Sequence, residues 1–471
     1  MSTLRTTACA VVAALASFSS VQGQEPPHDP PNFLVVILDD VGVDMVGAYQ
    51  EGTGVERTPT LDSLARSGVR FTRAYSSPVC SPTRACVMTG RYGFRTGIGT
   101  VEELGGHDLP LDEVTIPEAL DATGRGYSHA AIGKWHLSSD LEAGSTAPNE
   151  AGFHHFAGAL HNVVDYYDWD KTIDGEVVHT DGYITTDNAD SAIEWIASRA
   201  GPWCCYLAFN AAHTGWSGGR LYQDPPPDLT TYDDEPGRPL PPMQRRYLAI
   251  LEALDLELGR VLESLPPDVR ERTTVLVLGD NGTPGQVTQR PFPMTHGKGT
   301  IHEGGIRVPL VVSGYGVAHP GVCDALVHSV DLFATVADLA GLDARELQAL
   351  LPSGRTLDSV SLVPYLSDPA HASIRRTAFA EWFTPNHDPE TSDRILANRA
   401  IRDPRYKLIR HEAAVPGCDG KPFVVEELFD LAADPYEQDD LLHGLRPLSA
   451  TERARLEALR TELDRLLASG P

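Results

Sequence analysis

Residues 33–40 read FLVVILDD, and residues 275–281 read VLVLGDN. Both stretches are short apolar runs that end in a pair of polar side chains. Uninterrupted apolar runs of this length are typical of strands buried on both faces of a parallel sheet. Ligands of open α/β sheets bind beyond the carboxyl ends of such strands, so the two terminal pairs are expected to meet at one edge. The pairs are Asp39 with Asp40 and Asp280 with Asn281.

These three carboxylates and one amide oxygen match the ligand preference of a hard cation, because no histidine or cysteine adjoins them in the sequence. We predict one Ca²⁺ per chain rather than Mg²⁺, since Mg²⁺ tends to keep several waters. The alternative is that each aspartate only forms the turn after its strand. Two pairs at matched positions favour the metal site.

The apolar runs at residues 206–209 and 308–312 are further candidates for buried parallel strands. Amphipathic helical patterns occupy residues 60–67 and 244–262. Strands that alternate with helices predict an α/β domain in which helices cover both faces of the sheet. We assign residues 24–365 to this α/β domain.

Beyond residue 365 the pattern changes. Short strand-like stretches at residues 377–383, 406–410 and 428–431 are separated by turn signals. A charged amphipathic pattern at residues 451–467 predicts a closing helix. We therefore expect residues 366–471 to form a small α+β C-terminal subdomain.

The composition is that of a globular protein, with 41% apolar and 22% charged residues in a chain of 471. Its formal net charge of −27 argues against a nucleic-acid or anionic-membrane partner, because either would be repelled. Residues 1–23 read as a signal peptide, with Arg5 before a short apolar stretch and small residues at the cleavage site. The alternative is a buried N-terminal helix. We predict export to the periplasm or the medium.

The cysteines are too few for a disulfide scaffold, and no CxxC pair suggests zinc. Cys9 would leave with the signal peptide. Cys204 and Cys205 lie in an apolar run and are expected in the core. One bridge involving Cys323 or Cys418 stays open, because pairing cannot be deduced from sequence alone.

The most specific local motif is CSPTR at residues 80–84, a C-x-P-x-R pattern. Ser81 is a good N-cap, Pro82 a good first helical residue, and Gly90 a good helix stop. Cys80 would then lie at a helix N-terminus that favours an anion, with Arg84 one turn away. The alternative is a buried structural cysteine beside a surface arginine.

Lysine is scarce, since five lysines stand beside 33 arginines, so a lysine inside a motif is informative. In GKWH (133–136), Lys134 and His136 would face the same way on an extended chain. In HGKGT (296–300), Lys298 lies in a glycine-rich loop, and His213 follows the predicted strand at 206–209. These residues suit anion binding and proton transfer. Their alternative roles are a salt-bridged lysine and packed histidines.

Taken together, these motifs resemble the formylglycine-dependent sulfatases, an arylsulfatase-like family of the alkaline-phosphatase-like superfamily. The resemblance covers most of the mature chain. It rests on residues 32–49, TPTLDSLARSGVRFTRAY (58–75), CSPTRACVMTGRY (80–92), GKWHL, LGDNGT, KGTIHEGGIRVPL and ELFDLAADPYEQDDLL (427–442), in family order. It implies a mixed, mostly parallel sheet covered by helices and the hydrolysis of a sulfate monoester.

The resemblance also implies a role for each site residue. A maturation enzyme would oxidise Cys80 to formylglycine, whose hydrate supplies the nucleophilic oxygen. The Ca²⁺ ligands would be Asp39, Asp40, Asp280 and Asn281, with the residue at position 80 among them. Arg84 would steady the formylglycine hydroxyls, and Lys134 and Lys298 would bind sulfate oxygens. His213 would protonate the leaving alcohol, and His136 would take the proton in the step that releases sulfate.

Two alternative functions remain open in the sequence. One is a phosphonate monoester or phosphodiester hydrolase with the same nucleophile and metal, and the other is an inactive carbohydrate-binding relative. Thr214-Gly215-Trp216 follows His213 where the family often has proline, which could reshape the pocket rim. The substrate, a sulfated small molecule or a sulfated glycan, is not determined. Candidate rim residues are His154, His155, His161, Tyr166, Tyr167, Trp169 and Trp216.

Overall fold

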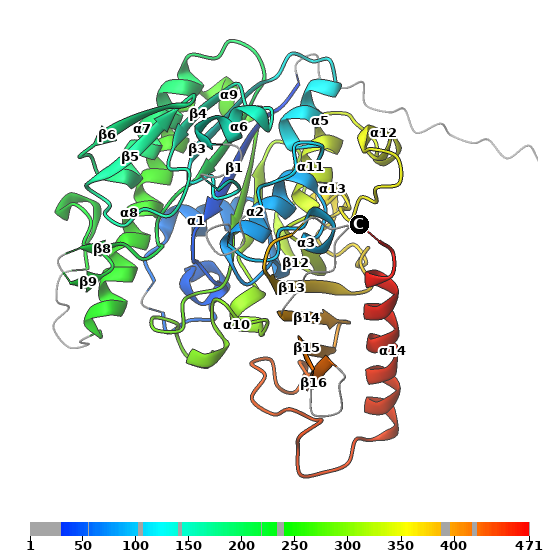
Figure 1. Ribbon diagram of the computed structural model, residues 1–471. Coiled ribbons are helices and arrows are strands. Elements are labelled where there is room, and N and C mark those ends of the chain that lie inside the picture. The colour runs from blue at the N-terminus through cyan, green and yellow to red at the C-terminus, as the bar shows by residue number, and fades with distance from the viewer. Residues whose placement is uncertain are drawn as a thin grey trace, which may run out of the picture.

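The structure is a computed structural model that describes residues 30–54, 56–101, 107–139, 144–217, 219–232, 240–387, 396–416 and 422–470. The predicted signal peptide, with Cys9, and also Cys418 lie outside the described residues. Within them, one large sheet with helices on both faces adjoins a smaller sheet near the C-terminus (Figure 1). No helix of these residues is long and apolar enough to cross a membrane.

The large sheet has ten strands among the described residues, in the order β12-β2-β11-β10-β1-β7-β3-β4-β5-β6. The strands are β1 (Asn32–Leu38), β2 (Val69–Tyr75), β3 (Ser128–Gly133), β4 (His155–Gly158), β5 (Trp169–Ile173), β6 (Glu176–Thr180), β7 (Trp203–Ala208), β10 (Thr273–Gly279), β11 (Leu310–Gly314) and β12 (Gly321–His328). The centre, β10-β1-β7-β3-β4, is parallel throughout. A mixed, mostly parallel sheet is therefore confirmed.

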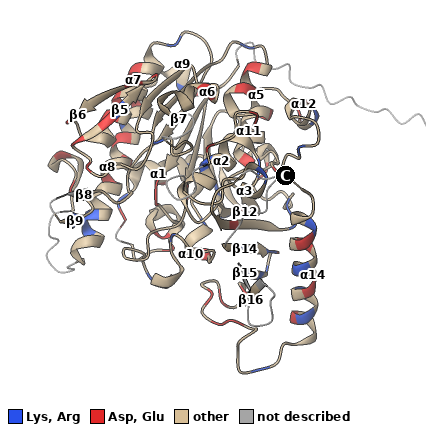
Figure 2. Cartoon of the chain, viewed as in Figure 1, with Lys and Arg blue, Asp and Glu red and all other residues tan. Residues whose placement is uncertain are grey.

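The smaller sheet is antiparallel and has the order β13-β14-β15-β16. Its strands are β13 (Ala378–Thr384), β14 (Leu396–Arg402), β15 (Tyr406–Pro416) and β16 (Pro422–Asp430). Helix α14 (Ala450–Leu467) lies beside this sheet, and acidic and basic residues alternate along it (Figures 1 and 2). The predicted α+β architecture after residue 365 is thus confirmed, whereas the exact domain boundary stays a prediction.

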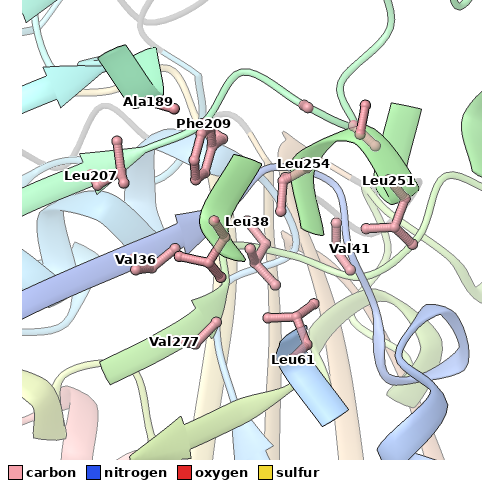
Figure 3. Close-up of a cluster of buried hydrophobic side chains, with 14 of the residues drawn as sticks. Val36, Leu38, Val41, Leu61, Ala189, Leu207, Phe209, Leu251, Leu254 and Val277 are labelled. Carbon is pink, nitrogen blue, oxygen red and sulfur yellow. The ribbon is translucent and has the colours of Figure 1, made fainter. Parts of the chain in front are cut away.

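Strand β1 shows why helices are needed on both faces. Its side chains alternate between two separate apolar clusters, with Leu34, Val36 and Leu38 in one and Phe33, Val35 and Ile37 in the other. Figure 3 shows part of the first cluster, in which Val36 and Leu38 face Leu254 and Leu61 from the covering helices. The continuous apolar run in the sequence follows directly from burial on both sides.

The covering helices divide between the two clusters. One face is covered by α1 (Pro59–Ser67), α7 (Ile184–Ala197) and α8 (Pro242–Ser264). The other face is covered by α2 (Cys80–Thr89), α5 (Ile116–Ala122), α11 (Asp331–Leu339), α12 (Ala344–Leu350) and α13 (Val363–Ser367). The helices expected at residues 60–67 and 244–262 are confirmed to within two residues at each end.

Shorter elements complete the described chain. They are α3 (Gly93–Thr96), α6 (Ala147–Glu150), α9 (Pro267–Glu271), α10 (Glu303–Ile306), β8 (Trp216–Ser217) and β9 (Arg220–Leu221), with single-turn 3₁₀ helices at Val43–Met45, Gly47–Tyr49, Gly144–Thr146, Pro227–Leu229 and Met294–His296. Cys204 and Cys205 are buried in the core as expected. Cys323 carries a free, buried thiol, so the bridge considered for it does not form.

One strand runs in the direction opposite to the one expected. The run at residues 308–312 becomes β11, which pairs antiparallel with both β10 and β2. The connection from β10 to β11 contains two short helices, the single-turn 3₁₀ helix at Met294–His296 and the four-residue helix α10, and no longer helix that could cover a face of the sheet. Because a parallel strand needs a crossover connection, the chain returns antiparallel.

Candidate active site

The register of the central strands brings the two polar pairs together. Leu38 at the end of β1 lies opposite Gly279 at the end of β10, so the next residues leave the sheet side by side. The Asp40 backbone N–H donates to Asp280 Oδ1 at 3.1 Å, and Asn281 Nδ2 donates to Asp40 Oδ1 at 2.9 Å. Asp39, Asp40, Asp280 and Asn281 are all buried. The expected meeting at one edge of the sheet is found.

Helix α2 brings Cys80 to the same edge. The helix begins at Cys80 itself, with Val79 as an extended N-cap, so the expected N-cap at Ser81 is wrong by two residues. Proline is accepted anywhere in the first helical turn, so Pro82 did not fix the start. Gly90 ends the helix in the left-handed conformation at φ 68°, as expected. Cys80 is therefore the first helical residue.

The Cys80 thiol lies between a carboxylate and a lysine. Its Sγ donates to Asp39 Oδ1 at 3.5 Å, and Lys298 Nζ donates to Sγ at 3.7 Å. The side chain is 1% exposed. Burial raises the pKa of the Cys80 thiol well above its ordinary value, which outweighs the opposing effect of Lys134 and Lys298. The unmodified side chain is a neutral thiol and a weak nucleophile.

Arg84 joins several parts of the site. Its Nη2 donates to Asp280 Oδ2 at 2.8 Å and lies 3.5 Å from Asp39 Oδ2. Its Nη1 donates to the Lys134 backbone oxygen at 2.9 Å. A fully buried guanidinium thus links the end of β10 to the end of β3, because its fork offers donors in two directions.

Two lysines balance the carboxylates. Lys134 Nζ lies 2.6 Å from Asp39 Oδ2, and Lys298 Nζ lies 2.5 Å from Asp40 Oδ1. Burial opposes ionisation of Asp39, but Lys134, followed by other cations nearby, holds its pKa well below the usual range. Burial opposes the charge of Lys298 too, yet Asp40 raises its pKa well above the ordinary value. Both lysines remain charged in the site.

His213 lies at the open side of the cluster. Its Nε2 is 4.0 Å from Asp40 Oδ2, and its Nδ1 is 3.2 Å from the Thr214 backbone oxygen. Because a carbonyl only accepts, the Nδ1 atom carries a hydrogen and Nε2 faces the carboxylates. Burial, followed by Lys298 and Lys134, lowers the pKa of His213 to about 4.

The geometry expected for His136 is wrong, although Lys134 does reach the carboxylates. Strand β3 ends at Gly133, and His136 has a left-handed backbone with φ 61°. The alternation of an extended chain therefore does not apply to residues 134–136. His136 is buried, and its Nε2 lies 3.3 Å from Asn162 Nδ2.

The donor set fits a hard cation. Asn281 Oδ1 is buried and has no hydrogen-bond partner among the described residues, although its amide nitrogen is satisfied. Burial and the neighbouring charge of Asp39 raise the pKa of Asp280 to about 6, a cost that a cation would remove. Atoms of Asp39, Asp40, Cys80 and His213 lie within 4.8 Å of one another, so His213 belongs to the same cluster.

A cleft of about 640 Å³ opens beside this cluster. Asp40 and Lys298 lie at its inner end, and neutral residues line the rest, including Val79, Gln286 and Met294. Thr214, the first residue of the departure noted after His213, also lines it. The sequence analysis did not single out Val79, Gln286 or Met294, because only the folded loops bring them to the cleft.

Several predicted rim residues lie elsewhere. Trp169 and Tyr166 are buried in the core, where the Tyr166 hydroxyl donates to the backbone oxygens of Asn210 and His213 at 2.7 Å. Tyr166 therefore supports the His213 loop from beneath. His154 and His155 line a different cavity near the start of β4.

The remaining candidates are less informative. The Tyr167 hydroxyl donates to the Asp224 backbone oxygen at 3.0 Å, and His161 is half-buried. The Trp216 side chain lies outside the described residues.

Comparisons with known proteins give one consistent result. Residues 31–342 match the family model described as Sulfatase. Arylsulfatase A from Bos taurus is 31% identical over 516 residues, which cover 100% of this chain and 94% of the bovine protein. The solved structure of Ps i-CgsB is 24% identical with a TM-score of 0.74 and 94% coverage of both chains. A protein solved with its substrate D-glucosamine-2-N,6-O-disulfate has a TM-score of 0.67 at 20% identity, over 94% of this chain and 98% of its own.

Proposed function

The chain belongs to the sulfatase family and is an enzyme that hydrolyses sulfate esters, and on that premise we propose that its nucleophile is formylglycine made from Cys80, acting beside a bound Ca²⁺. The observation that carries this proposal is the position of Cys80. Its Sγ contacts both Asp39, one of the proposed metal ligands, and Lys298, a proposed sulfate ligand. A nucleophile, a cation and a substrate oxyanion need this proximity.

The modification explains why a buried cysteine begins helix α2. A neutral thiol in this position is a poor nucleophile, since burial raises the pKa of Cys80. A formylglycine hydrate would supply two hydroxyl groups on one carbon, one to attack sulfur and one whose deprotonation allows sulfate to leave. A dedicated maturation enzyme would oxidise Cys80 before the protein folds, because the folded chain buries this side chain.

The proposed calcium ligands are the residues at the ends of β1 and β10 together with residue 80. They are Asp39, Asp40, Asp280, Asn281 and the residue made from Cys80. A bound Ca²⁺ would supply positive charge against the sulfate and nucleophile oxygens. The unpartnered oxygen of Asn281 and the crowded carboxylates support the assignment.

The lysines and the arginine have different tasks in the proposal. Lys134 and Lys298 bind the non-bridging sulfate oxygens, on which negative charge increases during the reaction. Arg84 fixes Asp280 and the Lys134 backbone, so it orients the metal ligands and the nucleophile. Water is excluded from this buried cluster and cannot stabilise the charge that develops there. The positive charges of these side chains must therefore already be in place when the substrate binds.

His213 is the proposed general acid. Its Nδ1 hydrogen faces the Thr214 carbonyl, so the second proton of the acid form would be carried at Nε2, on the side of the carboxylates and the cleft. Burial and two lysines make this proton acidic, and the negative charge of a bound sulfate ester would favour its uptake. The proton then passes to the leaving oxygen. His136 is proposed to take a proton in the step that releases sulfate.

We further propose that the cleft receives the alcohol part of a sparsely sulfated substrate, either a small aryl ester or a sulfated sugar. Beyond Asp40 and Lys298, the residues described along the cleft are neutral. A chain with a net charge of −27 would also repel a polyanion. A structural neighbour solved with a disulfated glucosamine supports a sulfated sugar as one candidate.

The nucleophile is tested with protein produced together with a formylglycine-generating enzyme. Mass spectrometry of the tryptic peptide 74–84 is expected to show formylglycine at position 80, and turnover of 4-nitrophenyl sulfate is expected to scale with the modified fraction. Cys80→Ala should abolish turnover and keep the folded spectrum. Cys86→Ser is the matched control, because Cys86 lies buried in the same helix away from the carboxylates. Full activity with unmodified Cys80 would overturn the proposal.

The reaction class is tested by a second comparison. The ratio of kcat/KM for 4-nitrophenyl sulfate and an aryl phosphonate monoester separates the sulfatase from the phosphonate hydrolase left open by the sequence. We expect kcat/KM to be much larger for the sulfate, and a larger kcat/KM for the phosphonate would overturn the assignment.

We also propose that residues 1–23 direct export, for which the N-terminal sequence of the mature protein is the test.

A further inference from the structure

A second cluster of metal-binding side chains lies at the other end of strand β3. It consists of Asp121 in α5, His129 in β3 and His154 immediately before β4. One carboxylate oxygen and one nitrogen of each imidazole lie within 4.8 Å of one another. Lys134 and the catalytic cluster follow the carboxyl end of β3, whereas His129 is its second residue. The two clusters are therefore separate sites.

His129 is the fixed part of this cluster. It is 0% exposed, its Nε2 lies 2.8 Å from Asp121 Oδ1, and its Nδ1 is buried without a hydrogen-bond partner among the described residues. The His154 ring lies 4.9 Å from the His129 ring, between centroids. If Asp121 and His129 only formed a hydrogen-bonded pair, no third metal-binding side chain would be needed beside them. Because His154 brings a second imidazole to this pair, the three side chains together offer a ligand set for one ion.

We propose that Asp121, His129 and His154 bind one Zn²⁺, in addition to the sulfatase activity and the calcium site. Two imidazoles and one carboxylate prefer zinc or a neighbouring transition metal to Ca²⁺, which takes oxygen ligands. Three protein ligands leave a fourth tetrahedral position for water.

The cluster needs only a small adjustment to accept the ion. Two ligand atoms that are each about 2.0–2.1 Å from a tetrahedral zinc are about 3.3 Å apart. His129 Nε2 and Asp121 Oδ1 are closer than this, at 2.8 Å. The Asp121 side chain is 50% exposed and has room to rotate outward, whereas the His129 side chain is fully buried. The exposed carboxylate and His154 would close on a buried, fixed nitrogen.

The chain supplies a matched control one residue away. His155 turns away from the cluster and pairs with Asp174, with its Nδ1 2.9 Å from Asp174 Oδ2. His154→Ala and His155→Ala are both changes of a partly exposed histidine in the same turn. Only His154→Ala removes a proposed zinc ligand.

The experiment is calorimetric titration of ZnCl₂ into folded protein that is kept in excess Ca²⁺, so that the catalytic cluster is occupied. We expect one Zn²⁺ per chain, an affinity at least about tenfold weaker in His154→Ala, and an unchanged affinity in His155→Ala. The melting temperature should rise with Zn²⁺ in the wild type and in His155→Ala but not in His154→Ala. Absent zinc binding, or binding that His154→Ala leaves unchanged, would overturn the proposal whatever the sulfatase activity.

Discussion

Lys298 is in contact with two partners whose roles differ. Its Nζ lies 2.5 Å from Asp40 Oδ1 and 3.7 Å from Cys80 Sγ, and it lies at the inner end of the cleft. The lysine therefore neutralises a proposed calcium ligand and also faces the position where a sulfate ester would enter. In the proposed reaction, Lys298 can bind the sulfate ester only because its ammonium group is held in place by Asp40.

Replacement of Lys298 separates activity from folding. We predict that Lys298→Ala lowers kcat/KM for 4-nitrophenyl sulfate by about 10²–10³-fold, the usual cost of losing one preorganised charge donor. Lys298→Arg should not restore activity, since a planar guanidinium cannot replace a compact ammonium between Asp40 and residue 80. Steady-state kinetics with circular dichroism as the folding check is the measurement. Activity within twofold of wild type would contradict the assigned role.

Calcium binding is best tested through stability, because that readout does not require turnover. We predict that Ca²⁺ raises the melting temperature and that EGTA reverses the effect, since at 100 times the Kd binding adds about 2.7 kcal/mol. Asp280→Asn should abolish most of the shift. Asp44→Asn is the control, because Asp44 is buried nearby but accepts from Thr283 and Gln289. An equal shift in Asp280→Asn would rule out the proposed ligand set.

At the level of single residues, the sequence predicted which side chains meet but not how each is oriented. The pairs after β1 and β10 could be predicted, because parallel register fixes where strand ends lie. His136 could not, because its left-handed backbone depends on the loop after Gly133. The cleft residues Val79 and Met294 were missed for a similar reason, since loop positions depend on tertiary contacts rather than local pattern.

Helices and strands were predicted best where the period of the apolar residues and the length of the segment indicated the same type of element. Helix α8 was found because its buried apolar positions recur from Tyr247 to Val261, and β1 because every residue after Asn32 in it is apolar. The direction of β11 depends on a connection whose path the sequence does not reveal. The start of α2 was missed because Val79, its N-cap, has no capping side chain.

Helix α1 illustrates capping by a residue that no local pattern could identify. Its own N-cap, Thr58, makes no capping side-chain bond. Instead, Asp255 of α8 accepts hydrogen bonds from the backbone N–H groups of Thr60 and Leu61 at 2.8 and 2.9 Å. Two of the unpaired donors at the start of α1 are thus satisfied from another helix. Burial raises the pKa of Asp255 to about 6 despite these bonds.

This shift predicts a pH-dependent contribution to stability. The folded-state pKa of Asp255 is above its ordinary value, so its contribution is full below about pH 4 and is lost as pH rises through about 6. The loss amounts to about 3 kcal/mol at most. Urea unfolding from pH 4 to 7 should show wild-type stability falling relative to Asp255→Asn, which cannot ionise. A constant difference across this range would exclude the effect, whereas Asp255→Ala should be less stable at every pH.

Across the whole molecule, the small C-terminal sheet is attached to the part of the chain that carries the large sheet by a buried group of charges. Lys407 in β15 lies 3.1 Å from Glu303 Oε1 in α10 and 2.7 Å from Glu437 Oε1 in the loop after β16. Glu437 also accepts from the Glu303 backbone N–H. The stretch at residues 427–442 and the stretch KGTIHEGGIRVPL, far apart in sequence, therefore meet in space.

This junction lies close to the site along the chain, because α10 begins five residues after Lys298. Tyr436 of the same C-terminal loop packs its ring against Phe292 and donates to Glu51 at 3.0 Å. The contact with Phe292 holds the loop that carries Lys298 from the side of the small sheet. The region of the small sheet is thus expected to affect catalysis through the position of this loop, although none of its described residues belongs to the carboxylate cluster.

Replacement of Lys407 tests this coupling at the scale of the whole molecule. Lys407→Met would leave Glu303 and Glu437 buried without their shared cation, and removal of one partner of a buried pair costs about 3–5 kcal/mol. We predict a loss of that size in urea unfolding, together with a lower kcat in the protein that remains folded. Arg405→Ala is the control, because its pair with Asp430 lies in the same sheet but is 57% exposed on the arginine side. An exposed pair contributes about 0–1 kcal/mol, so Arg405→Ala should change neither stability nor kcat appreciably. If Lys407→Met lowered stability but left kcat unchanged, the small sheet would stabilise the fold without positioning Lys298.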